Sequence, residues 1–135
     1  MVLADGAGTP LGVLVEAATP AEVTLLRKTV QQGPWELLDS QPERLILDRA
    51  YDSNAVRRDL AERGIEPIIP ARKNNRHATH QDGRKLRRYK KRWKMERTHA
   101  WLQNFRRLVV RYERLTANYL ALVHLACALI TLRKV

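Results

Sequence analysis

Residues 44–70 read RLILDRAYDSNAVRRDLAERGIEPIIP, and this stretch decides the fold class. The apolar run 44–47 ends on Asp48 and predicts a strand, while residues 54–63 have helical spacing and are followed by Gly64, a residue typical of helix ends. Residues 65–70 predict a short edge strand, because their two prolines cannot donate the hydrogen bonds of a central strand. This order indicates a mixed α/β domain.

The residues before this stretch predict a hairpin and a helix. Residues 2–4 and 11–15 are short β-prone runs, and the turn-forming residues 5–10 join them. Asp5 precedes a glycine there, which is typical of a turn residue. Residues 19–22 have the residue types of a helix start and predict a helix that runs to about Gln32.

The residues after this stretch predict a loop and two helices. Residues 71–83 are polar and basic and predict an exposed loop, followed by a long helix from about 84 to 103. The apolar run 115–132 contains several polar residues and predicts a buried helix, from about 118, rather than a membrane span. Within it, His124 is interpreted as a core histidine and Cys127 as a small buried hydrophobe.

Composition limits the broad class of the protein. The chain has 135 residues, a formal net charge of +11 and 44% hydrophobic residues, values that fit one folded domain over residues 1–135 and argue against a membrane protein. Its single Cys127 can form neither an internal disulfide nor a cysteine-based zinc site. The first residues lack the pattern of a secretory signal, so we expect a cytoplasmic protein.

The charge is concentrated in one part of the chain. Residues 1–70 carry a net charge of −4, whereas residues 71–114 carry +13. So many cations repel one another unless a polyanion neutralises them, and nucleic acid is the obvious polyanion. A solvated, solubilising surface is the alternative, although such surfaces usually mix charges of both signs.

Four residues of the predicted long helix fall on one face. Tyr89, Arg92, Glu96 and Gln103 have helical spacing, and Glu96 lies among cations. Glu96 is therefore either an ion-pair partner or a ligand for a hard cation such as Mg²⁺. Asp48 favours the second interpretation, because an acid at the C-terminal end of a buried strand stands where α/β sheets place their sites. Asp52, by contrast, is interpreted as the cap of the following helix.

Several of these segments together resemble a known family. Residues 48–53, 68–72, 88–102 and 105–113 are similar to the C-terminal part of bacterial insertion-sequence transposases of the DDE type, in the "four/five" grouping. The family signature Tyr-x2-Arg-x3-Glu-x6-Lys is met at Tyr89, Arg92 and Glu96. Gln103 stands where the signature has its lysine.

The resemblance implies an RNase H-like α/β fold, with a mixed sheet flanked by helices and long C-terminal helices. It implies DNA transposition, in which two aspartates and one glutamate hold Mg²⁺ (or Mn²⁺) for hydrolysis and strand transfer of DNA phosphodiesters. Asp48 corresponds to the second aspartate and Glu96 to the glutamate, as catalytic residues and metal ligands. The family's first aspartate lies on a strand upstream of residue 2, so the chain is expected to be N-terminally truncated, without its first strand, and inactive as encoded.

The expected partner is double-stranded DNA, both transposon ends and target, in the bacterial nucleoid; we expect no membrane partner. The chain is also expected to form a homodimer or to pair with an intact transposase. The alternative is a non-enzymatic basic DNA-binding remnant that competes with an intact transposase. The candidate DNA-binding residues share a polar or cationic side chain in or near the basic segment: Arg72, Lys73, Arg88, Tyr89, Lys91, Arg92, Arg97, Gln103, Arg106 and Arg107. Trp93 and Trp101 are interpreted as helix-packing residues, and His77 and His80 as loop residues near phosphate.

Overall fold

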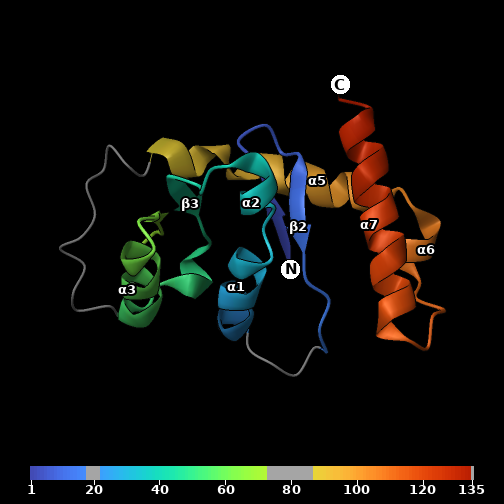
Figure 1. The fold of residues 1–135 in the computed structure, drawn as a ribbon, viewed down its shortest axis with the longest axis horizontal. Coiled ribbons are helices and arrows are strands. Elements are labelled where there is room, and N and C mark those ends of the chain that lie inside the picture. The colour runs from blue at the N-terminus through green and yellow to red at the C-terminus, as the bar shows by residue number, and fades with distance from the viewer. Residues whose placement is uncertain (18–21, 73–86, 135) are drawn as a thin grey trace. The chain divides into compact units, whose positions relative to one another are not determined.

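The computed structural model describes residues 1–17, 22–72 and 87–134 (Figure 1). The chain divides into two compact units. The hairpin unit comprises Met1–Pro34 and Trp93–Val135, and the βαβ unit comprises Trp35–Arg92. Both helices and strands occur in the described residues, which confirms the mixed α/β class.

The hairpin unit begins with the predicted pair of strands. β1 (Val2–Ala4) pairs antiparallel with β2 (Pro10–Val13). Asp5 closes the turn, because its carboxylate accepts hydrogen bonds from the backbone N–H groups of Ala7 at 2.8 Å and Thr9 at 2.7 Å. The hairpin and the interpretation of Asp5 as a turn residue are both confirmed.

Four helices accompany the hairpin: α1 (Glu22–Gln31), α5 (Trp93–Gln103), α6 (Arg106–Val109) and α7 (Thr116–Leu132). Leu102 of α5 packs with Ala126 and Ile130 of α7 in a buried cluster, and Trp101 and Phe105 cover its side. The body of α1 matches the predicted helix, whereas its predicted start at residues 19–21 lies outside the described residues.

The turn of the hairpin is fixed to α5 by side chains that bind its carbonyl groups. Thr98 is fully buried, and its hydroxyl lies 2.7 Å from the carbonyl oxygen of Gly8. Lys94 donates to the Gly6 carbonyl, and Arg97 donates to the Ala7 carbonyl at 2.8 Å. Beyond α7, Lys134 also reaches the Ala7 carbonyl, at 3.1 Å. These bonds satisfy turn carbonyls that no strand or helix would satisfy.

The βαβ unit contains the stretch that decided the fold class. β3 (Arg44–Ile46) and β4 (Glu66–Ile68) form a parallel pair, and α3 (Asn54–Glu62) connects them. The chain also forms a short α2 (Trp35–Leu38) before β3 and two 3-10 helices, η1 (Arg49–Tyr51) and η3 (Arg87–Arg92).

Local sequence explains the boundaries of α3. The Ser53 side chain accepts a hydrogen bond from the N–H of Val56 at 3.2 Å and so caps the helix. Gly64, at φ +73°, ends it in the left-handed conformation that glycine adopts without strain. Leu60, Ile65 and Ile69 belong to the buried apolar interior, since each is at most 2% exposed.

Three predictions are corrected by the structure. The long helix expected from about 84 to 103 is a 3-10 helix over 87–92 followed by α5, and residues 84–86 lie outside the described range. In the 3-10 form residues three apart lie in line, so Tyr89 and Arg92 both reach Asp48 of another element. Asp52 is not the cap of α3, because Ser53 holds that position.

The third correction concerns α7, which is buried on one side only. Val123, Ala126 and Ile130 are buried, whereas Leu125 is 58% and Leu132 is 70% exposed. His124 is exposed too, so its interpretation as a core histidine is wrong. The run is apolar all round, and sequence periodicity therefore could not tell which side packs. Within the described residues no helix has the length and hydropathy needed to cross a membrane.

Candidate active site

Asp48 lies at the C-terminal end of β3, where the chain turns into η1. Its backbone is extended, and its carboxylate accepts a hydrogen bond from the N–H of Arg49 at 2.6 Å, so Asp48 caps the 3-10 helix. The side chain is half exposed. A carboxylate held by its own turn and open to solvent has a defined orientation and can bind an external group.

Tyr89 and Arg92 come from η3, about forty residues later, and meet Asp48. The Arg92 guanidinium lies 2.9 Å from Asp48 Oδ1, and the Tyr89 hydroxyl lies 3.3 Å from the same oxygen. Arg92 also donates to the Tyr89 hydroxyl at 2.8 Å. Residues three apart eclipse one another in a 3-10 helix, which is why both side chains reach one oxygen. Three residues that the sequence proposed for the site are thus brought together.

Asp52, Arg57 and Arg72 form a second charged group behind this turn, and we name it the clamp. Asp52 is fully buried at its side chain, and its Oδ1 lies 2.8 Å from the guanidinium of Arg57. Its Oδ2 accepts a hydrogen bond from the backbone N–H of Arg72 at 2.7 Å. Sequence reasoning missed this group. The available signal was Ser53, a sufficient cap that leaves Asp52 for another role.

The guanidinium of Arg72 binds two backbone carbonyls, although the residue is exposed. Nε donates to the carbonyl of Arg49 at 3.1 Å, and a terminal nitrogen donates to the carbonyl of Ala50 at 2.5 Å. Arg57 in turn donates to the Ile69 carbonyl at 2.8 Å. The clamp therefore joins η1, α3 and the end of β4 within one unit.

Glu96 and Gln103 belong to the hairpin unit. Glu96 is exposed in the first turn of α5, and Gln103 is exposed at the end of the same helix. A carboxylate near a helix N-terminus is favourably placed, because the helix dipole is positive there. Glu96 thus lies in a different unit from Asp48, which belongs to the βαβ unit.

The remaining candidate DNA-binding residues differ in how their side chains are occupied. Arg88, Lys91 and Arg106 are exposed. Arg107 is exposed but forms an ion pair with Glu113 at 3.1 Å. Lys73, like the loop histidines His77 and His80, lies outside the described residues. Arg88, Lys91 and Arg106 have no ion pair among the described contacts, so they can meet phosphate without breaking one.

Arg97 is held between two indole rings. Its guanidinium carbon lies 4.8 Å from the ring centroid of Trp93 and 4.7 Å from that of Trp101, a geometry in which the cation is attracted by both rings. Trp101 packs against the buried cluster of α5 and α7, as predicted for a helix-packing residue. Trp93 is 51% exposed, so the same prediction is wrong for that residue.

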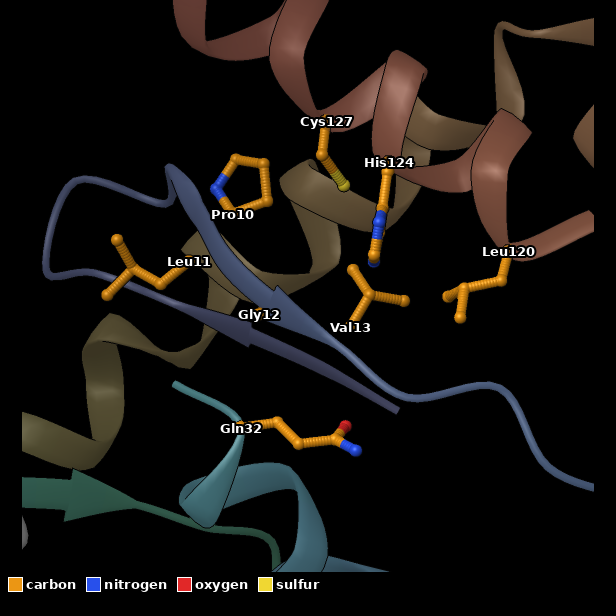
Figure 2. A pocket seen from close by; sticks show the side chains of 8 residues that line it. All are labelled: Pro10, Leu11, Gly12, Val13, Gln32, Leu120, His124 and Cys127. Carbon is orange, nitrogen blue, oxygen red and sulfur yellow. The ribbon is translucent and has the colours of Figure 1, made fainter. Parts of the chain in front are cut away.

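The hairpin unit contains a groove of about 430 Å³ between β2 and α7 (Figure 2). Figure 2 shows the side chains of His124 and Cys127 projecting from α7 toward β2. Burial raises the pKa of the Cys127 thiol, so the thiol stays protonated at neutral pH and is a poor nucleophile. The groove's lining includes no carboxylate, and a metal-dependent phosphodiester reaction needs one. Its lining residues are Pro10, Leu11, Gly12, Val13, Gln32, Leu120, His124 and Cys127.

Across residues 1–17, 22–72 and 87–134, no group of three or more histidine, cysteine or acidic side chains could hold a metal ion. Asp48 nevertheless has the chemistry of a hard-cation ligand, because it is a carboxylate and half exposed. Asp52 lacks that accessibility, because its buried oxygens bind Arg57 and the Arg72 amide.

Comparison with known proteins identifies the family of the chain. The profile of the transposase DDE domain matches residues 1–131. The chain belongs to the DDE transposase family. A relative from Burkholderia cepacia, described as a putative transposase for insertion sequence element IS402, is 38% identical over 141 residues. The match covers 98% of the present chain and 63% of that relative. No solved structure matches the chain.

Membership in the family confirms the resemblance found in the sequence. The chain spans less than two thirds of the length of that relative.

Proposed function

We propose that the chain forms part of the catalytic domain of an insertion-sequence transposase, which hydrolyses and joins DNA phosphodiesters during transposition. The observation that carries this proposal is the meeting of Asp48 with Tyr89 and Arg92, in a chain that belongs to the DDE family. We further propose that residues 1–135 form one domain with an RNase H-like arrangement of strands. The two short sheets of the described residues are compatible with this arrangement.

Asp48 and Glu96 are the proposed catalytic carboxylates and would hold Mg²⁺ or Mn²⁺. When bound, such an ion polarises the phosphodiester and lowers the pKa of the attacking hydroxyl or water. Arg92 binds Asp48 Oδ1, and its guanidinium is suited to a phosphate oxygen when the carboxylate has another partner. Tyr89 orients both groups through its hydroxyl. We assign the family's first aspartate to no residue, since Asp5 closes the hairpin and Asp52 belongs to the clamp.

The proposed DNA surface consists of cations over residues 72–111, and its strongest members are the exposed residues of η3 and α6. Arg88 and Lys91 flank Tyr89, so phosphates bound there would lie beside the proposed carboxylate. Contacts of this kind fix the register of the duplex but read no base sequence. The acting form is proposed to be a pair, of two such chains or of this chain with a longer transposase, on nucleoid DNA.

Metal-dependent nicking of supercoiled plasmid tests the enzymatic proposal. The enzymatic proposal requires Mn²⁺-dependent nicking that Asp48→Asn or Glu96→Gln reduces at least about hundredfold, because two-metal chemistry fails without its carboxylates. A chain that is inactive as encoded shows no nicking. Asp59→Asn is the matched control, since Asp59 lies on α3 and pairs with Arg63 at 3.3 Å. Both carboxylate variants must keep the wild-type unfolding midpoint for the result to count.

A basic DNA-binding remnant without chemistry is the second candidate function, and the occupied state of Asp48 favours it, because Arg92 already neutralises that carboxylate. Duplex DNA binding that neither Mg²⁺ nor Asp48→Asn alters, together with no nicking, supports the remnant. Affinity should fall steeply with salt in either case, because bound phosphates release counterions. An affinity independent of salt contradicts both candidates.

A further inference from the structure

The turn that presents Asp48 is held from behind by residues that take no part in the proposed chemistry. Asp48 caps η1 with its own carboxylate, so the direction of that carboxylate depends on the position of η1. Within the turn, the N–H groups of Tyr51 and Asp52 bond back to the carbonyls of Asp48 and Arg49, at 3.0 and 3.1 Å. A 3-10 helix of three residues makes too few internal bonds to hold a fixed position alone.

Arg72 supplies the missing support. Its side chain donates to the Ala50 carbonyl, which has no other partner among the described backbone hydrogen bonds, and to the Arg49 carbonyl, which also accepts the N–H of Asp52. A planar guanidinium can bind both carbonyls at once, which a lysine ammonium cannot do in the same geometry. Arg72 thus acts as the C-terminal cap of the turn that carries Asp48.

The backbone of Arg72 is fixed as well, through the buried carboxylate of Asp52. That carboxylate accepts the N–H of Arg72 on one oxygen and the guanidinium of Arg57 on the other. Arg57 binds the carbonyl of Ile69, so the chain just before Arg72 is fastened to α3. Because the anion at the centre is fully buried, these bonds are little weakened by solvent.

We propose that Arg72 is a positioning residue, which fixes the carboxylate of Asp48 through η1, and that it is not a phosphate ligand. This removes Arg72 from the proposed DNA surface of residues 72–111, in which the sequence placed it. The positioning role rests on the proposed function, because only in that function does Asp48 bind a metal ion. Asp52 and Arg57 support the same turn by holding the end of β4.

Three measurements on the full chain test the proposal: amide hydrogen exchange, the salt dependence of duplex DNA binding, and broadening of the Asp48 and Arg49 amide signals by Mn²⁺ alone. The variants are Arg72→Gln, which retains the backbone N–H, and Arg72→Lys, which retains the charge. Arg88→Gln is the control for an exposed phosphate-binding cation, and Arg58→Gln is the control for an exposed arginine of α3, 77% exposed at its side chain.

In both Arg72 variants the amide hydrogens of Tyr51 and Asp52 should exchange about tenfold faster than in wild type. The broadening of the Asp48 and Arg49 signals by Mn²⁺ should be weaker. A purely structural contact would leave the Mn²⁺ effect unchanged. The slope of log affinity against log salt should stay at its wild-type value in Arg72→Gln, while Arg88→Gln lowers it by about one. Arg58→Gln should change none of the three quantities.

Two results overturn the inference while leaving the proposed function intact. One is a salt slope lowered by about one in Arg72→Gln, with wild-type exchange of the turn, which identifies a phosphate ligand. The other is unchanged Mn²⁺ broadening despite faster exchange, which reduces Arg72 to a structural contact. If the wild-type chain itself shows no Mn²⁺ effect at Asp48, the proposed metal role fails and the positioning role fails with it.

Discussion

In the βαβ unit the turn after β3 is held by a fully buried carboxylate, whereas in the hairpin unit the turn between β1 and β2 is held by a buried hydroxyl and several cations. Asp52 is the centre of the first arrangement and Thr98 of the second. In both, side chains distant in sequence donate hydrogen bonds to carbonyls of the turn, Ala50 in the first and Gly8 in the second. The difference lies in the charge at the centre.

The comparison indicates where each unit is sensitive to substitution. Removing a buried anion leaves a nearly buried cation without its partner, while removing a neutral hydroxyl leaves only a carbonyl without a donor. The βαβ turn should therefore lose more stability from one change than the hairpin turn does. Four predictions follow this order.

Asp52→Ala should have the largest effect, lowering the free energy of unfolding by about 3 to 5 kcal/mol, as found when one partner of a buried ion pair is removed. Arg57, whose side chain is 16% exposed, would keep its hydrogen bond to the Ile69 carbonyl but lose the Asp52 carboxylate. Urea unfolding measures the change. Asp59→Ala removes an exposed pairing partner on the same helix and should cost less than about 1 kcal/mol. Equal effects of the two variants would contradict the distinction between the units.

Gly8→Ala should follow, with a loss of about 2 to 3 kcal/mol. Gly8 has φ +79°, and a Cβ there would lie 3.1 Å from both the Lys94 carbonyl oxygen and the Thr98 hydroxyl. Backbone strain of this kind costs about 1 to 3 kcal/mol by itself. Gly6→Ala is the matched control in the same turn, since no atom lies within 4 Å of its added Cβ. A loss of stability at Gly6 as large as at Gly8 would show that the approach of α5 is unimportant.

Thr98→Val should lower stability by about 1 to 2 kcal/mol, because the Gly8 carbonyl loses its buried donor while side-chain volume is kept. Thr131→Val is the control: its hydroxyl bonds only to the Cys127 carbonyl of the same helix, at 2.9 Å, among the described contacts. That control should change stability by less than about 0.5 kcal/mol. Thermal unfolding of both variants gives the comparison, and equal shifts would exclude a special role for the turn.

Asp5→Ala should show the smallest effect, and it depends on pH. Burial acts to raise the pKa of Asp5, but hydrogen bonds from Thr9 and Ala7, with the charge of Lys134, hold the pKa below its ordinary value of 3.8. A lowered pKa means that the carboxylate stabilises the fold above pH 3.8 and that this contribution is lost as the pH falls through the lowered pKa. The variant should lose about 1 kcal/mol at pH 7, and the difference from wild type should vanish in acid. A difference that persists unchanged at low pH would argue against the charged turn.

Local patterns in the sequence were sufficient for most of the elements. The hairpin, the body of α1, β3, α3 and β4 were predicted from turn residues, caps and short apolar runs, and the structure confirms them. The form of residues 87–92 was predicted wrongly, because the choice between an α-helix and a 3-10 helix depends on contacts with Asp48 from another element. The exposed side of α7 could not be predicted, since the run is apolar all round.

The sequence by itself determined the family and the spacing of the candidate site residues Asp48, Tyr89, Arg92 and Glu96. Only the tertiary structure decided what the arginines do. Arg92 meets a carboxylate, Arg97 lies between two indoles, and Arg72 caps a turn, although all three belong to the same basic stretch. The physical reason is that the role of a charge is set by its nearest partner in space. The partners of Arg92 and Arg72 lie on another element, whereas the two indoles beside Arg97 lie one turn away on the same helix, α5.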